Sequence, residues 1–178
     1  IYLGIGKKYL TKSENKYYLK NINYKNYIIS VISCVKYHNI INLLKGFKLL
    51  NKKDYINLKF ILVMQVLDKK YFKEINDFIE TNFKNNEIIL LHNLESNYLV
   101  NLYKNANFYI FSSYSEVFGL TSLEAMSQNC PVVISNTSAL PEINGGAAEY
   151  FNPDDELEIK KKMQMIIINH EHRNQLIQ

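Results

Sequence analysis

Short apolar runs alternate with helix-like segments along most of this sequence. Runs of strand length predict β-strands, and apolar residues at helical spacing predict helices between them. The expected strands cover residues 27–35, 58–67, 88–91, 108–112, 131–135 and 149–151. The expected helices cover 39–50, 69–83, 98–106, a segment from about 122, a short turn at 140–144, and a long C-terminal segment.

This alternation predicts the α/β fold class, with a Rossmann-like parallel sheet covered by helices on both faces. Right-handed crossovers would then place a ligand crevice at the C-terminal ends of the strands. Residues 1–26 are polar and are expected to form an entry or linker segment, which leaves 27–178 as one domain. Because the chain begins with Ile rather than Met, it is expected to be a fragment of a longer protein.

One segment, residues 112–131, carries the most informative chemistry. It places Glu116 after an apolar run and Glu124 just inside a helix, with Gly119 between them. A glycine loop followed by a helix N-terminus supplies free backbone N–H groups and a positive dipole end, which favour a phosphate. The two flanking carboxylates are acceptors for hydroxyl groups. A sugar nucleotide combines a diphosphate with hydroxyls on both sides, so the segment predicts a nucleotide-sugar site.

Composition and other motifs exclude several classes of protein. The net charge of +4 comes almost wholly from lysine, since the only arginine is Arg173, which argues against nucleic-acid binding. There is no G-x-G-x-x-G or P-loop motif, and no Asp-x-Asp motif or Glu/His cluster, so neither a dinucleotide cofactor nor a metal is expected. No apolar run reaches the roughly 18 residues that span a bilayer. Cys34 and Cys130 are expected to be structural thiols in a reduced cytoplasm.

The sequence also resembles a known family over almost its whole length. The resemblance is carried by EVFGLTSLEAM at 116–126, with its E-x7-E element, followed in order by PVVISN at 131–136 and LPEING at 140–145. LYKNANFYIFSS at 102–113, residues 147–154 and IYLGIG at 1–6 extend it. These motifs resemble the donor domain of retaining group 1 (family-4) glycosyltransferases. The resemblance implies the C-terminal half of a GT-B fold, in which two Rossmann-like domains face each other across a cleft.

The resemblance implies a role for each motif residue. Glu116 would contact the hydroxyls of the transferred sugar, and Glu124 those of the ribose. The backbone amides that would face the sugar and the diphosphate belong to Phe118, Gly119, Leu120 and Thr121. The segment expected beside the nucleobase consists of His92, Asn93 and Leu94. The donor would be a nucleoside-diphosphate sugar, used without a metal or other cofactor.

Departures from the family pattern lie where the donor diphosphate would bind. The family's arginine after the first strand corresponds to about Ser33, and its partner lysine corresponds to His38, with Lys36 nearby. Lys36 or a protonated His38 is therefore expected to replace the guanidinium, as a point charge rather than a bidentate fork. Together with Glu116, these two residues are the candidate catalytic residues. Two family glycines are also replaced, which is expected to narrow the site.

The resemblance also implies partners outside this chain. An N-terminal domain would bind a glycan or lipid-linked acceptor, and family products are commonly cell-surface polysaccharides, lipopolysaccharides and glycolipids. The full-length enzyme is expected in the cytoplasm, at the inner face of the membrane through peripheral association. The isolated domain is expected to bind donor weakly and to transfer little sugar, because half of the cleft is missing.

Other interpretations of individual residues stay open on the sequence alone. Thr121 and Glu124 also fit a capping box, and His38 fits an ordinary helix start. Asp154 and Asp155 are expected to form a turn and the N-terminal cap of the last helix. His170 and His172 in the polar tail are expected to be solvated.

Three other functions are consistent with the sequence. A GT-B-like sugar-nucleotide epimerase would share the donor architecture, but the carboxylates and histidines that its proton abstraction needs are not apparent. A non-catalytic or truncated nucleotide-sugar-binding module would explain the absent acceptor domain and the lost arginine. A purely structural α/β domain would leave the clustered motif without a role.

Overall fold

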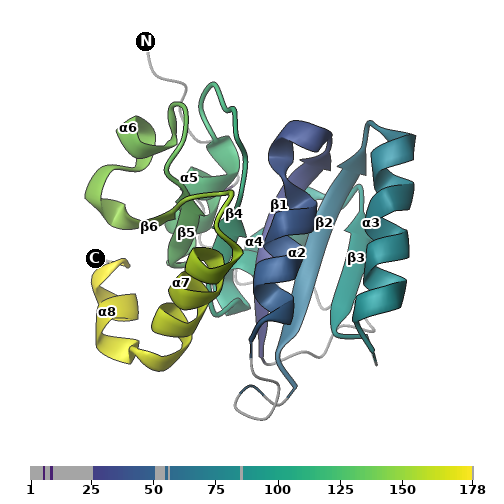
Figure 1. The fold of residues 1–178 in the computed structure, drawn as a ribbon. Coiled ribbons are helices and arrows are strands. Elements are labelled where there is room, and N and C mark those ends of the chain that lie inside the picture. Colours follow the sequence, from purple (N-terminus) through teal and green to yellow (C-terminus); the bar gives the residue numbers. More distant parts are fainter. Residues whose placement is uncertain are drawn as a thin grey trace.

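The computed structural model describes residues 6, 9, 26–50, 55, 57–84 and 86–177. Over these residues the chain forms a six-stranded sheet in the order β3-β2-β1-β4-β5-β6, with every neighbouring pair parallel (Figure 1). The strands are β1 (Tyr27–Cys34), β2 (Lys59–Val66), β3 (Ile88–His92), β4 (Tyr109–Phe111), β5 (Val132–Ser135) and β6 (Ala148–Phe151). The predicted α/β, Rossmann-like parallel sheet is confirmed.

Helices cover both faces of this sheet. On one face α2 contacts both α3 and α7, and on the other α4 contacts α5 (Figure 1). The described helices are α2 (Ile40–Lys48), α3 (Lys69–Asn82), α4 (Ser96–Asn105), α5 (Leu120–Ser127), α6 (Leu140–Asn144), α7 (Glu156–Ile168) and α8 (His170–Gln175), with the 3₁₀ turns η1 (Lys36–His38) and η2 (Gly145–Ala147).

The centre of the sheet is built from the most apolar segments of the chain. β1 and β2 pair in register from Tyr27 opposite Lys59 to Cys34 opposite Val66. Side chains on both faces of these strands are buried, as expected for a sheet between two helix layers. Each fully buried Ile, Leu or Phe stabilises the fold by about 1.5–3 kcal/mol relative to an exposed one.

The direction of strand order reverses at β1, which has β2 on one side and β4 on the other. After β1 the chain enters α2 on one face of the sheet, and after β4 it enters α5 on the opposite face (Figure 1). Connections that leave neighbouring strands toward opposite faces open a crevice at the C-terminal strand ends. In this chain the crevice lies between the β1–α2 and β4–α5 connections.

Two helices differ from the sequence-based expectation. α5 begins at Leu120 rather than near residue 122, with Gly119 as a left-handed N-cap, so the capping box of Thr121 and Glu124 does not form. The predicted long C-terminal helix is divided into α7 and α8 at Asn169. The φ of −92° and ψ of 88° at Asn169 leave the helical region, and its side chain accepts a hydrogen bond from the N–H of His172.

For two side chains near the C-terminus, one prediction from the sequence is confirmed and one is wrong. Asp155 caps α7 as predicted, because its carboxylate accepts from the N–H groups of Leu157 and Glu158 at 2.9 Å. His172 is not solvated as expected, since its Nε2 lies 2.6 Å from Oε1 of Glu149 in β6. The break before α8 turns this histidine back onto the sheet, which a continuous helix would not do.

The expected entry segment, residues 1–26, lies outside the described residues except for Gly6, Tyr9 and Asn26. None of the helices that the structure describes is long and apolar enough to cross a membrane.

Candidate functional site

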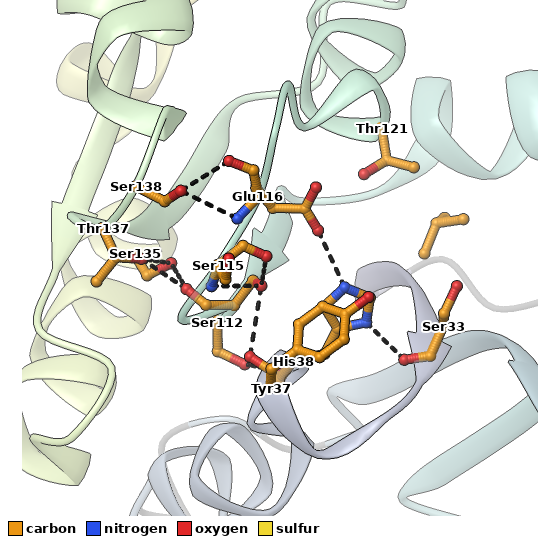
Figure 2. A network of polar contacts seen from close by, with 12 residues as sticks. Ser33, Tyr37, His38, Ser112, Ser115, Glu116, Thr121, Ser135, Thr137 and Ser138 are labelled. Carbon is orange, nitrogen blue, oxygen red and sulfur yellow. Dashed lines mark hydrogen bonds and ion pairs between the residues drawn. The ribbon is translucent and has the colours of Figure 1, made fainter. Parts of the chain in front are cut away.

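The chain turns sharply after β1 and buries His38 at the end of the turn η1. The His38 side chain is only 7% exposed, and its ring packs against Tyr37 and Phe111, with centroid distances of 4.5 and 5.4 Å. Its Nδ1 lies 2.6 Å from the carbonyl oxygen of Ser33, and its Nε2 lies 3.0 Å from Oε1 of Glu116 (Figure 2). The imidazole therefore joins the end of β1 to the loop after β4.

The backbone around His38 is held from two other elements. Ser112, at the end of β4, donates from Oγ to the carbonyl oxygens of His38 at 2.9 Å and Asn39 at 3.2 Å. Asn39 adopts a left-handed φ of 53°, which asparagine tolerates better than most residues, and its side chain donates to the Pro153 carbonyl at 2.7 Å. These contacts fix the direction in which the imidazole points.

The loop that carries Glu116 is held by hydroxyl groups from the end of β5 and the segment after it. Ser135 and Thr137 both donate to the Ser113 carbonyl at 2.6 Å. Ser138 binds the backbone of Glu116 on both sides, accepting from its N–H at 3.2 Å and donating to its carbonyl at 2.7 Å (Figure 2). The Glu116 side chain, 21% exposed, is thereby directed toward His38.

Gly119 sets where α5 begins. Its φ of +67° lies in the left-handed region, and a Cβ at this position would lie 2.5 Å from Cδ2 of the buried Leu140. Only glycine combines this conformation with this close approach at little strain. The first turn of α5 can therefore point its backbone N–H groups into the crevice.

Two adjoining pockets occupy the crevice. One, of about 290 Å³, is lined by His38 and Glu116 and by the residues from Val117 to Thr121 at the start of α5. The other, of about 260 Å³, extends past β2 to Asn93 and Leu94. The pockets share Ser33, Thr121 and the end of β1, so they form a continuous path across the C-terminal strand ends.

The structure gathers most of the predicted site residues along this path. Nine of the predicted positions line one pocket or the other: Ser33, His38, Asn93, Leu94, Glu116, Phe118, Gly119, Leu120 and Thr121. Lys36 lines neither pocket, because its Nζ lies 3.7 Å from Glu74 of α3 and its side chain is 63% exposed. His92 also lies outside both, with Nδ1 3.3 Å from the Met64 carbonyl.

Glu124 lines neither pocket, and its carboxylate contacts tyrosine side chains. The Tyr103 hydroxyl donates to its Oε2 at 3.5 Å, and Tyr9 also hydrogen-bonds the carboxylate. Burial, followed by the charge of Glu124, raises the pKa of Tyr9 to about 12. Both phenols therefore stay neutral donors near neutral pH and orient this carboxylate.

Sequence reasoning missed the hydroxyl groups that support the site. Tyr103 and Tyr109 are fully buried, yet each has a polar contact at the site, and the Tyr109 hydroxyl lies 2.7 Å from Oγ1 of Thr121. Ser138 was not singled out either. Tyrosines at helical or strand spacing resemble other core aromatics, so their hydroxyl contacts become visible only when distant elements pack together.

Among the described residues, no group of three or more His, Cys, Asp and Glu side chains could hold a metal ion. The candidate site instead offers one carboxylate–imidazole pair beside the N-terminus of α5. Amide N–H groups at a helix N-terminus suit an anion, and a carboxylate suits hydroxyl groups.

Comparisons with known proteins identify the family of this chain. The family model described as glycosyl transferases group 1 matches residues 12–178. The O-antigen chain mannosyltransferase RfbU of Salmonella typhimurium is 30% identical over 132 residues, which are 74% of this chain and 36% of RfbU. The capsular polysaccharide biosynthesis glycosyltransferase CapM of Staphylococcus aureus is 27% identical over 159 residues, 88% of this chain and 40% of CapM. The chain thus spans about two fifths or less of these relatives.

Solved structures show the same fold at lower identity. An α,α-trehalose-phosphate synthase (UDP-forming) from Burkholderia xenovorans matches 86% of this chain and 38% of its own, with a TM-score of 0.75 and 13% identity. The C-terminal domain of a group 1 glycosyl transferase family protein (LpcC) from Francisella tularensis matches 85% of this chain and 80% of its own, with a TM-score of 0.74 and 22% identity. The family model covers nearly all of the sequence, and the chain belongs to the group 1 glycosyl transferases.

Proposed function

We propose that this chain is the donor-binding half of a retaining glycosyltransferase that uses a nucleoside-diphosphate sugar. One observation carries the proposal: Glu116 and the N-terminus of α5 line the same pocket of about 290 Å³ at the reversal of strand order. A diphosphate fits the amide N–H groups, and the sugar hydroxyls fit the carboxylate.

In this proposal the donor lies along both pockets. The diphosphate binds at the residues from Gly119 to Thr121, the sugar extends toward Glu116, and the base extends toward Asn93 and Leu94. Glu124, held by Tyr103, would bind the ribose hydroxyls. Amide groups at the helix N-terminus would stabilise the charge that develops on the departing diphosphate. No metal is needed for this step.

The acceptor and the setting are part of the same proposal. The chain spans less than half of RfbU and CapM, whose printed names concern O-antigen and capsular polysaccharide. A glycan or lipid-linked acceptor would bind a further domain across the cleft, on the cytoplasmic side and with peripheral membrane association. Hexosyl transfer, with mannose as one candidate sugar, is consistent with the mannosyltransferase names of several relatives.

Binding without transfer is a second candidate function. Among the described residues lining the pocket at α5, none is a lysine or an arginine, and the nearby Lys36 pairs with Glu74 instead. A diphosphate leaving group without a fixed cation would depart slowly. The same pocket could then hold a nucleotide sugar without transferring it.

Ligand-observed NMR tests donor binding directly. Saturation transfer would be measured from this chain to UDP-glucose, GDP-mannose and ADP-glucose. One of these nucleotide sugars is expected to receive saturation from the parent protein. The transfer should be weaker from the variants Glu116→Gln and Glu124→Gln. The matched control Glu80→Gln, on the exposed side of α3, should behave as the parent. If a folded sample transfers no saturation to any of the three nucleotide sugars at millimolar concentration, the proposal is contradicted.

A further inference from the structure

The hydrogen bonds of His38 determine how many protons its site holds. The Ser33 carbonyl oxygen only accepts hydrogen bonds, so Nδ1, at 2.6 Å from it, carries a proton. The second nitrogen lies 3.0 Å from a Glu116 carboxylate oxygen, and that contact needs a proton as well. The pair therefore holds one proton more than a neutral imidazole beside a carboxylate.

From this arrangement we propose that His38 is a doubly protonated counter-ion of Glu116, and that donor binding depends on its second proton. The inference rests on the proposed donor site, since it concerns the same pocket. His38 acts here as a positioning residue: it orients the carboxylate and offsets its negative charge.

The charge balance of the pocket explains why this proton matters. A nucleotide sugar brings two negative charges next to Glu116, and like charges in a partly buried site repel strongly. Among the described residues lining this pocket, His38 is the one side chain that can carry a positive charge. Loss of its proton would leave the Glu116 carboxylate uncompensated beside the diphosphate.

Packing keeps the imidazole where it can serve this role. Tyr37 and Phe111 enclose the ring on two sides, and the side chain is only 7% exposed. The Glu116 backbone is fixed independently by Ser138. Both partners are held by other contacts. The His38 and Glu116 side chains therefore have little freedom to separate and bind water instead.

Other titratable groups surround His38 on each element that packs near it. From its own turn Lys36 points to Glu74 of α3, and Tyr37 lies against the ring. Burial, then Asp68, raises the pKa of Cys34 at the end of β1 to about 11. On the β4 side, burial and the bond to Asp154 raise the pKa of Tyr114 to about 12. Cys34 and Tyr114 thus keep their protons in the range where histidine changes charge.

The sign of the pH dependence follows directly. At low pH the ring holds both protons and the donor binds. Loss of the second proton as pH rises would remove the compensating charge and weaken binding. The affinity is therefore expected to fall with rising pH, by about tenfold or more once that charge is lost, which is the effect of losing one charge-assisted contact.

Nucleotide sugars are suitable probes because each of their phosphates has one ester and one anhydride bond and therefore keeps one negative charge at all the pH values measured. Affinities for UDP-glucose, GDP-mannose and ADP-glucose would be measured by NMR titration at several pH values. The variant His38→Lys supplies a fixed cation, so its affinity for these nucleotide sugars is expected to depend little on pH. His38→Gln should bind weakly at every pH.

A matched control is provided by the second histidine–glutamate pair. His172 contacts Glu149 at 2.6 Å, yet neither residue lines the two pockets. His172→Gln is therefore expected to keep the pH slope of the parent. Binding that is independent of pH in the parent, or an unchanged slope in His38→Gln, would overturn the inference and leave donor binding intact.

Nitrogen-15 NMR of the histidine rings tests the proton itself, without a ligand and without a variant that has to fold. Spectra recorded at about pH 6 are expected to show a proton on both ring nitrogens of His38, because each nitrogen faces an oxygen that accepts. A singly protonated His38 ring at that pH would contradict the inference. The absence of binding to any nucleotide sugar, together with a doubly protonated ring, would contradict the proposed function instead.

Discussion

His38 and Glu116 are 78 positions apart in the sequence and 3.0 Å apart in space, and the site depends on that contact. Each residue is held by backbone and hydroxyl contacts that do not involve the other. Ser112 and Asn39 hold the histidine turn, and Ser138 holds the glutamate loop. At the scale of single residues, small hydroxyl side chains therefore determine where the charged groups point.

Ser138→Ala tests this supporting role. Loss of its two hydrogen bonds to the Glu116 backbone is expected to weaken nucleotide-sugar binding about three- to tenfold, as expected for one net hydrogen bond. The free energy of unfolding should change by less than about 1 kcal/mol, because Ser138 is exposed. Thr81→Val removes a 2.7 Å hydrogen bond on α3 and serves as the control, with unchanged binding. Equal affinities in Ser138→Ala and the parent would argue against the role.

Gly119→Ala tests the left-handed start of α5. A side chain at a φ of +67° costs about 1–2 kcal/mol, and the added Cβ meets Leu140 at 2.5 Å. The urea midpoint of the variant is expected to fall accordingly. Gly146→Ala is the matched control, because nothing lies within 4 Å of its Cβ, and it should change stability by less than about 0.5 kcal/mol. Identical midpoints for the two variants would contradict the argument.

At the scale of elements, hydrophobic periodicity predicted the strands and most helices, because each buries one continuous apolar stripe or run. It failed where backbone conformation or a single polar contact decided the boundary. Gly119 starts α5 earlier than the apolar pattern indicates, and Asn169 interrupts a helix whose apolar residues continue up to it. The pairing of His38 with Glu116 could not be read from spacing, since it requires β1 and β4 to be neighbours.

The close approach of α2 and α7 leads to an element-scale prediction. A Cβ on Gly46 would lie 2.4 Å from Cγ2 of the buried Ile159 in α7. Gly→Ala in an open helix stabilises by up to about 1 kcal/mol, but here overpacking should reverse the sign and destabilise by about 1–3 kcal/mol.

A double-mutant cycle separates these two effects. Ile159→Ala alone leaves a cavity and is expected to cost about 2–5 kcal/mol. Gly46→Ala in the Ile159→Ala background should be less harmful than in the parent, because Cγ2 is gone and only the residue-159 Cβ, at 2.8 Å, is still too close. Urea unfolding of the four proteins gives the coupling energy. Additive changes would show that α2 and α7 adjust without strain.

At the scale of the whole molecule, the core contains ionisable groups that must stay neutral in the folded state. Burial raises the pKa of the phenols of Tyr27, Tyr103 and Tyr109 and that of the Cys130 thiol. In the unfolded chain the same groups lose their protons at lower pH, near the ordinary pKa values of 10.0 for tyrosine and 9.0 for cysteine. Their contribution to stability is therefore complete below about pH 9 and declines as pH rises further.

Alkaline unfolding follows from this difference. Between the unfolded and folded pKa values the unfolded state releases protons that the folded state retains, so the unfolding free energy falls with each pH unit. Urea midpoints measured from about pH 7 to pH 11 should stay level at first and then decline above about pH 9. Tyr27→Phe removes one of these phenols, together with its 2.8 Å hydrogen bond to the Leu102 carbonyl. That variant is expected to be less stable at pH 7 and to decline less steeply, and a midpoint that stays level up to pH 11 in the parent would mean that the buried groups do not titrate on unfolding.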